Sequence, residues 1–79
     1  MSWYCFEVRR GDHAGAPTVG SCADDDARAA ALRATKLVPL VNRSALYYSL
    51  MKLEPGEGFT VRNLLGRAYY FERVLQSEP

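Results

Sequence analysis

The start of the chain, from Ser2 to Arg9, is rich in aromatic and β-branched residues, which predicts a β-strand. Successive side chains of a strand point to opposite faces, so the stretch divides into two sets of alternate residues. Trp3 lies on the solvent side of this strand and is a candidate contact residue. After a loop that contains glycine and proline, Thr18–Cys22 is expected to return as an antiparallel second strand. Three alternate side chains of the first strand should face the core: Tyr4, Phe6 and Val8.

The stretch Asp24–Val38 predicts the central helix. Aspartates open it, where free backbone N–H groups and the positive end of the helix dipole favour acids, and Pro39 ends it. Apolar residues recur every three or four positions on one side. Because most of them are alanine, we expect this side to pack closely against the strands or a second helix. The stripe comprises Ala27, Ala30, Ala31, Ala34, Leu37 and Val38.

Two more short helices are predicted. The first runs from Ala45 to about Leu53, where leucines recur every three or four residues, and Asn42 or Ser44 caps its start. The second begins at Thr60 and continues to Leu75, with apolar residues at helical spacing and one interrupting glycine. Its last part, Arg67–Leu75, is also rich in β-forming residues, so a strand is the alternative there.

These elements predict one domain over residues 1–79. It belongs to the α+β class, with an N-terminal β-hairpin packed on an Ala-rich central helix and two short helices beside it. The chain is 48% hydrophobic, which is typical of a globular protein. Its formal net charge is +1, so bulk electrostatics favour neither nucleic acid nor an anionic membrane. Eight of the ten basic residues are Arg, which suits recognition of phosphate or carboxylate.

The sequence also favours a cytoplasmic protein without membrane contact. Its start has neither the basic region nor the apolar run of a signal peptide. The longest apolar run, Leu37–Val41, is far shorter than the ~20 residues that a membrane span needs. In the cytoplasm, Cys5 and Cys22 are expected to be reduced thiols.

No arrangement of residues predicts a catalytic or metal centre. His13 is the only histidine, and neither a nucleophile nor paired metal-ligand spacing accompanies it. The acidic run at residues 24–26 lacks the ligand set of a calcium loop. Gly56–Gly58 lacks the residues of a phosphate-binding loop. We therefore expect a protein that is not an enzyme and has no cofactor.

A small helix-turn-helix-like DNA-binding protein is the alternative hypothesis. Three short helices between Leu46 and Leu75 would carry several arginines. Placing Gly66 at the turn of the motif, however, puts Arg62 where a small residue should pack. It also puts Glu72 where the recognition helix should be buried. Together with the net charge, this makes nucleic acid the less favoured partner.

Exposed charged and aromatic residues predict a surface for a protein partner. Tyr47 and Tyr48, like Tyr69 and Tyr70, are neighbours in sequence, and adjacent helical residues cannot both face the centre of the core. Tyr and Arg are enriched at the energetic centres of protein interfaces. We expect a monomer or homodimer that binds its partner through eight residues: Asp24, Asp25, Asp26, Leu32, Tyr48, Arg67, Tyr70 and Arg73.

In its size, its α/β character and its lack of a catalytic motif, the chain resembles the short proteins with which bacteriophages inhibit host defences, the anti-CRISPR proteins in particular. That class shares no common motif, so the resemblance transfers no site residue. It implies tight binding to a CRISPR effector complex, which blocks recognition of target DNA. The aspartates at residues 24–26 would then meet a basic nucleic-acid groove, or the Arg and Tyr surface would meet an acidic face of an effector subunit.

Overall fold

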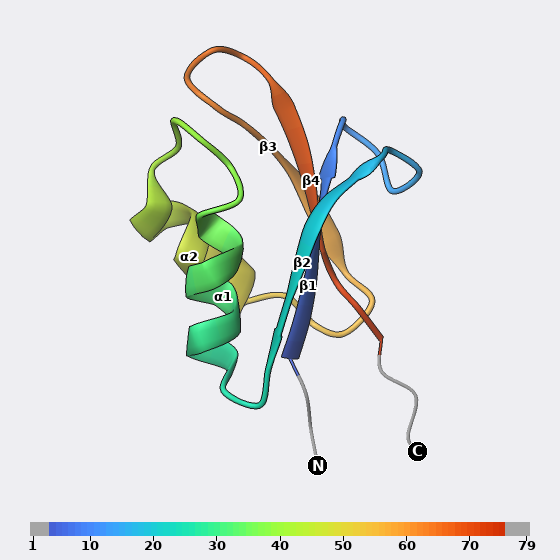
Figure 1. Ribbon diagram of the computed structural model, residues 1–79, viewed down its shortest axis with the longest axis vertical. Helices are drawn as coiled ribbons and strands as arrows, with labels where there is room; N and C mark the ends of the chain where they lie inside the picture. Colours follow the sequence, from blue (N-terminus) through green and yellow to red (C-terminus); the bar gives the residue numbers. More distant parts are fainter. Residues whose placement is uncertain (1–3, 76–79) are drawn as a thin grey trace.

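The computed structural model describes residues 4–75 (Figure 1). Trp3, the candidate contact residue near the N-terminus, lies outside them. The strands form one antiparallel sheet in the order β2-β1-β4-β3. Both helices lie on the same face of this sheet, so the fold belongs to the α+β class. The six elements are β1 (Tyr4–Arg10), β2 (Thr18–Asp24), α1 (Ala27–Thr35), α2 (Arg43–Met51), β3 (Gly58–Arg62) and β4 (Ala68–Arg73).

The central strand β1 pairs with both β2 and β4. Phe6 and Val8 are buried under the helices, as the alternating pattern predicts. Cys22 of β2 lies opposite Phe6, and Phe71 of β4 lies opposite Val8, so these residues share the helix-covered face. The pairing with β2 shifts by one residue after Val8, which is a β-bulge. The predicted N-terminal hairpin is therefore present, and β4 extends it to a larger sheet.

The helix α1 is shorter than the predicted range of Asp24–Val38. Asp26 is its N-cap and accepts a hydrogen bond from the Arg28 N–H at 3.0 Å. Asp24 instead ends β2. At the other end, residues 36 and 37 donate to carbonyl oxygens three positions back, which tightens and closes the last turn. Four residues of the predicted stripe are fully buried: Ala30, Ala31, Ala34 and Val38.

The helix α2 begins directly after the connector that follows α1, residues 36–42. Asn42 caps it, with its Oδ1 accepting the Ala45 N–H at 3.1 Å. Leu46, Leu50 and Leu53 are buried against the sheet and α1, as the leucine spacing predicts.

The predicted third helix, over Thr60–Leu75, is wrong. These residues form the β3–β4 hairpin, and the alternative strand near Arg67–Leu75 is present as β4. The helical spacing was misleading because Leu64, one of its seam residues, lies in the turn and is 85% exposed. The hairpin is favoured because β4 inserts between β1 and β3 and so satisfies its backbone groups on both sides. Alternate side chains then face the helices: Phe59, Val61, Tyr69 and Phe71.

The second face of the sheet carries mostly polar side chains that bond to one another. Arg9 forms an ion pair with Glu7 at 2.7 Å and also donates to the Thr18 hydroxyl at 3.1 Å. Tyr70 lies across Gly58 of the neighbouring strand, where a Cβ atom would collide with its hydroxyl group. Arg9, Glu7 and Tyr70 are half buried on this face.

Candidate functional site

The turn between β3 and β4 is held by one buried side chain. Asn63 Oδ1 accepts hydrogen bonds from the N–H groups of Leu65 and Arg67, both at 3.0 Å. Gly66 has a φ of 81°, a left-handed conformation that glycine adopts without strain. With Asn63 bonded in this way, the turn presents Leu64 and Leu65 to solvent, 85% and 77% exposed.

The connector between α1 and α2 reaches the same turn. The Leu64 N–H donates to the Leu40 carbonyl oxygen at 2.9 Å. Leu40 has a φ of 59° and is half exposed. A left-handed backbone on a leucine costs about 1–2 kcal/mol, so the surrounding contacts hold an apolar side chain in a strained, solvent-facing position. Three leucines thus lie together at one end of the molecule: Leu40, Leu64 and Leu65. We call them the turn-end leucines.

An apolar groove lies beside these leucines, between α2 and β3. Its volume is about 300 Å³, and Leu40 and Leu64 form part of its rim. Val41, Phe59 and Val61 contribute to its walls. The groove has the mainly apolar lining that is typical of sites for an apolar side chain of a partner.

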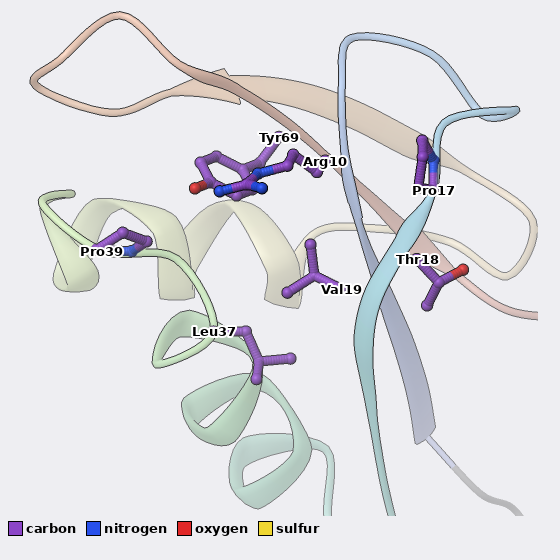
Figure 2. A pocket seen from close by; sticks show the side chains of 7 residues that line it. All are labelled: Arg10, Pro17, Thr18, Val19, Leu37, Pro39 and Tyr69. Atoms are coloured by element: carbon purple, nitrogen blue, oxygen red, sulfur yellow. The ribbon is translucent and has the colours of Figure 1, made fainter.

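A second cleft, of about 490 Å³, separates β2 from the same connector. Figure 2 shows Val19 and Leu37 pointing into it from opposite walls, whereas Thr18 points away. Arg10 reaches across its upper end on the side of Tyr69. This cleft therefore combines an apolar floor with one cation.

A third cleft, of about 410 Å³, lies between the two hairpin turns. We call it the arginine cleft, because Arg10, Arg62 and Arg67 line it together with Gly11, Asp12 and Ala68. The Arg10 side chain itself extends toward Tyr69 in the second cleft. Their spacing along the sequence did not predict that these arginines lie near one another. The three residues meet because β1 and β3 end, and β4 begins, at the same end of the sheet.

The three aspartates of the predicted partner surface have different structural roles. Asp24 accepts the Asp26 N–H at 2.9 Å and forms an ion pair with Arg33 at 3.1 Å. The bond from Asp26 and the interactions with Asp25 and Arg33 hold the pKa of Asp24 below its usual value. Asp26 caps α1, while Asp25 is exposed in the turn between β2 and α1. Of these three aspartates, Asp25 alone neither caps a helix nor forms an ion pair with a residue of the described range 4–75.

Arg73 and Tyr70 are less accessible than the sequence analysis expects. Arg73 is half buried on the helix side, with its guanidinium 4.8 Å from the centre of the Tyr4 ring and an N–H donating to the Leu53 carbonyl oxygen at 3.0 Å. Tyr70 is half buried over Gly58. We had expected Arg73 on a solvated face. Instead, its side chain packs at the margin of the core.

The remaining predicted contact residues are exposed but dispersed. Arg67 lies in the β3–β4 turn, Leu32 is half exposed on α1, and Tyr48 is exposed on α2 with its ring edge against Tyr47. The turn-end leucines were missed. The one signal for them in the sequence was the Leu64-Leu65-Gly66 run, which we interpreted as part of a helix.

We also examined His13, possible groups of metal ligands and the two helices. His13 is exposed, and its Nδ1 accepts the Gly15 N–H at 3.1 Å within the β1–β2 loop. Within residues 4–75, no group of three or more potential metal ligands lies together. In the same range, neither helix has the length and apolar character to cross a membrane.

The two thiols are free. Cys22 packs against the core, while Cys5 lies opposite Ala23 on the other face of the sheet, so the side chains point apart. Burial raises the pKa of the Cys5 thiol, which disfavours its reactive thiolate form.

Comparison of the chain with protein-family models, with curated protein sequences and with solved structures found no match.

Proposed function

We propose that this protein is a non-enzymatic binding module that docks onto a protein partner through the turn-end leucines. The observation that carries the proposal is Leu40, an apolar side chain exposed to solvent on a left-handed backbone. Strain of this kind is retained where function needs the side chain in that position. An ordinary turn would place glycine or asparagine there.

Further support comes from the surroundings of these leucines. Leu40 and Leu64 line the groove between α2 and β3, so a partner side chain entering that groove would contact both of them. Arg62 borders both the groove and the arginine cleft. Apolar anchors next to arginine are the usual composition of the energetic centre of a protein interface. The partner surface is therefore expected to combine an apolar projection with carboxylates.

In its most specific form, the proposal makes the partner a subunit of a CRISPR effector complex and the protein a phage inhibitor of target-DNA recognition. That form rests on the resemblance in size, α/β character and lack of a catalytic motif. It is tested in bacteria whose CRISPR system targets an infecting phage. Expression of the protein should raise the number of plaques, and an unchanged number would exclude this form.

The general proposal is tested with variants that separate binding from folding. Leu40→Gly removes the side chain and relieves the left-handed strain, so the protein should be at least as stable as the wild type while partner capture is lost. Leu64→Ser with Leu65→Ser should lose capture as well. Leu75→Ser is the matched control, because Leu75 is 68% exposed and follows β4 at the opposite end of the sheet. It should capture the partner as the wild type does.

Tagged wild-type and variant proteins are compared by affinity purification and mass spectrometry. A partner that all variants retain equally would refute docking through the leucines. A second set, Leu32→Ser with Tyr48→Ser, tests the helix surface that the sequence favours. Light scattering gives the oligomeric state. If the wild type is a dimer and the leucine variants are monomers, the surface joins two copies of this chain and the proposal of a separate partner is wrong.

A further inference from the structure

We propose that the outer edge of β3 binds an extended segment of the partner protein as a fifth strand of the sheet. Alternate apolar side chains of that segment enter the groove between α2 and β3. The inference rests on the proposed function, because Leu40 and Leu64 line this groove, and it names the form of the partner. Within residues 4–75, β3 pairs with β4 on one side and with no strand on the other (Figure 1). Such an edge presents N–H and C=O groups to which a further strand can bond.

The hydrogen bonds at the two ends of β3 show which of its backbone groups face outward. The Arg73 N–H donates to the Glu57 carbonyl oxygen at 2.9 Å, and the Asn63 N–H donates to the Arg67 carbonyl oxygen at 3.0 Å. Bonding direction alternates from one residue to the next in an antiparallel pair, so the odd-numbered residues of this stretch bond to β4. Three residues therefore turn their N–H and C=O groups away from β4: Gly58, Thr60 and Arg62. Within residues 4–75, no other residue bonds to these outward groups.

The connector between α1 and α2 already bonds to the backbone just beyond this edge. The Leu64 N–H, two residues after the end of β3, donates to the Leu40 carbonyl oxygen at 2.9 Å. From Leu40, which has a φ of 59°, the chain continues into α2 at Arg43 and does not follow β3. The connector thus occupies the position next to the turn and leaves the edge from Arg62 to Gly58 without a strand partner among the described residues.

The groove beside this edge can receive the side chains from one face of an added strand. Phe59 and Val61 lie on the helix-covered face of β3 and line the groove together with Leu46 of α2. Every second side chain of a bound segment would point to the same face. Of the residues that line the groove, Arg62 alone is charged. These alternate positions of the segment should therefore be apolar.

The opposite face of β3 favours an acidic residue in the segment. Thr60 and Arg62 alternate with Phe59 and Val61, so their side chains lie on the face that the helices do not cover. Arg62 is exposed, and neither ion pair within residues 4–75 involves it. Opposite charges on neighbouring strands attract each other. The expected segment thus alternates apolar and polar residues and carries Asp or Glu beside Arg62.

The other edge strand, β2, is less suited to such pairing. Its pairing with β1 contains a bulge after Val8, and bulges are a common protection of sheet edges. The Ala23 carbonyl oxygen of β2 already accepts an N–H of Arg33 at 2.8 Å. The pairing of β3 with β4, in contrast, keeps one register from Gly58 to Arg62. The edge of β3 is therefore the one that another chain can extend regularly.

The size of this edge favours a segment of a partner over a second copy of the chain. β3 has five residues. A strand of this length forms a strip about 17 Å long. Two copies joined by this strip alone would bury much less than the about 800 Å² per partner of a stable interface. A segment that also fills the groove adds apolar contacts to its main-chain bonds.

Amide hydrogen exchange of the free protein tests the edge first. The amides of Gly58, Thr60 and Arg62 should exchange rapidly, and those of Phe59 and Val61 slowly, because only the second set bonds to β4. Slow exchange of the outward amides in a monomer would overturn the proposal.

The probe is then a peptide selected on the immobilised protein from a displayed library of random short peptides. The selected sequences should alternate apolar and polar residues and carry an acidic residue. Binding should slow exchange at the three outward amides of β3 and leave the amides of β2 unchanged. This readout uses the wild-type protein and does not depend on any variant.

Thr60→Pro is the main variant. It removes one outward N–H and leaves the bonds of Phe59 and Val61 to β4, a position where an edge strand tolerates proline. It should weaken binding of the selected peptide about tenfold. Thr60→Val is the matched control, because it also loses the hydroxyl bond to the Asp12 carbonyl oxygen but keeps the backbone N–H, and it should bind as the wild type does.

Arg62→Glu provides a second test that leaves the backbone of β3 unchanged. It should weaken the acidic peptide about fivefold. A peptide with lysine in place of its acidic residue should recover the lost affinity for this variant.

The outcomes separate strand addition from docking through the turn-end leucines. If Thr60→Pro and Thr60→Val bind equally well while Leu64→Ser with Leu65→Ser loses the peptide, the leucine docking stands and strand addition is overturned. If Thr60→Pro loses the peptide and the leucine variants retain it, strand addition stands and the proposed function is wrong.

Three further results would overturn strand addition. The library yields no peptide, or the bound peptide slows exchange in β2 instead of β3. Alternatively, the outward amides of the free protein are protected only at concentrations at which light scattering detects a dimer, which assigns the edge to a second copy of this chain.

Discussion

Replacing Asn63 with alanine should loosen the turn that presents Leu64 and Leu65 to solvent. The change removes one acceptor atom that holds two backbone N–H groups, those of Leu65 and Arg67, each at 3.0 Å. A neutral hydrogen bond contributes about 1 kcal/mol net, and more where the unsatisfied group stays buried. Asn63 itself is buried, but both donors belong to exposed residues that water reaches. We therefore expect a loss of about 2 kcal/mol from two bonds.

Urea unfolding followed by circular dichroism measures this loss. For a slope of about 1 kcal/mol per molar urea, the midpoint should fall by about 2 M. A domain of this size is expected to have a stability of about 4–12 kcal/mol, so the variant should remain folded. Thermal unfolding should shift downward by about 8–16 °C in parallel.

Asn63→Asp is the matched control. Its carboxylate keeps the acceptor oxygen in place and adds a negative charge close to Arg62 and Arg67, so the turn should be at least as stable as in the wild type. Equal midpoints for the alanine and aspartate variants would refute the reasoning, because the acceptor atom would then have no role. A wild-type midpoint for Asn63→Ala would refute it as well.

Three further predictions concern the core, the sheet and the thiols. Ala34→Leu should lower the free energy of unfolding by about 1–3 kcal/mol through overpacking of a fully buried site, and an unchanged denaturation midpoint would contradict the burial of α1. Gly58→Ala should also destabilise by about 1–3 kcal/mol, because its Cβ would lie 2.6 Å from the Phe71 carbonyl oxygen; a stabilised variant would show that β-propensity outweighs the clash. Thiol titration should find both Cys5 and Cys22 free in the unfolded, non-reduced protein, with slow reaction of Cys5 in the folded state; a disulfide would contradict the opposed orientations.

The charged residues of the predicted partner surface show which features sequence spacing predicts and which it does not. Of the aspartates at residues 24–26, Asp26 was correctly placed at the start of a helix, because capping depends on a few neighbouring backbone groups, whereas Asp24 ends β2. Whether they are available to a partner depends on tertiary contacts. Arg33 approaches Asp24 from the last turn of α1, and Arg73 contacts the Tyr4 ring from a strand at the other end of the described chain. Spacing alone does not predict such long-range pairings.

The sequence by itself determined the local elements whose signals lie within a few residues. Aromatic and β-branched residues predicted β1, the Asn42 cap and the leucine spacing predicted α2, and the alanine stripe at helical spacing predicted α1. Each of these follows from bonds and side-chain directions inside one segment, so neighbouring residues carry the information.

The tertiary structure decided the fate of residues 58–73 and the position of every candidate site. Their apolar residues fit a helix and a hairpin almost equally well, and the choice was made by β1, which offers an unpaired edge to β4. The same pairing brings Arg10 beside the turn that carries Arg67, and it lets Leu64 bond to Leu40. Backbone hydrogen bonds between distant strands are satisfied only in the assembled sheet, so the energy that selects this arrangement does not exist in any single segment.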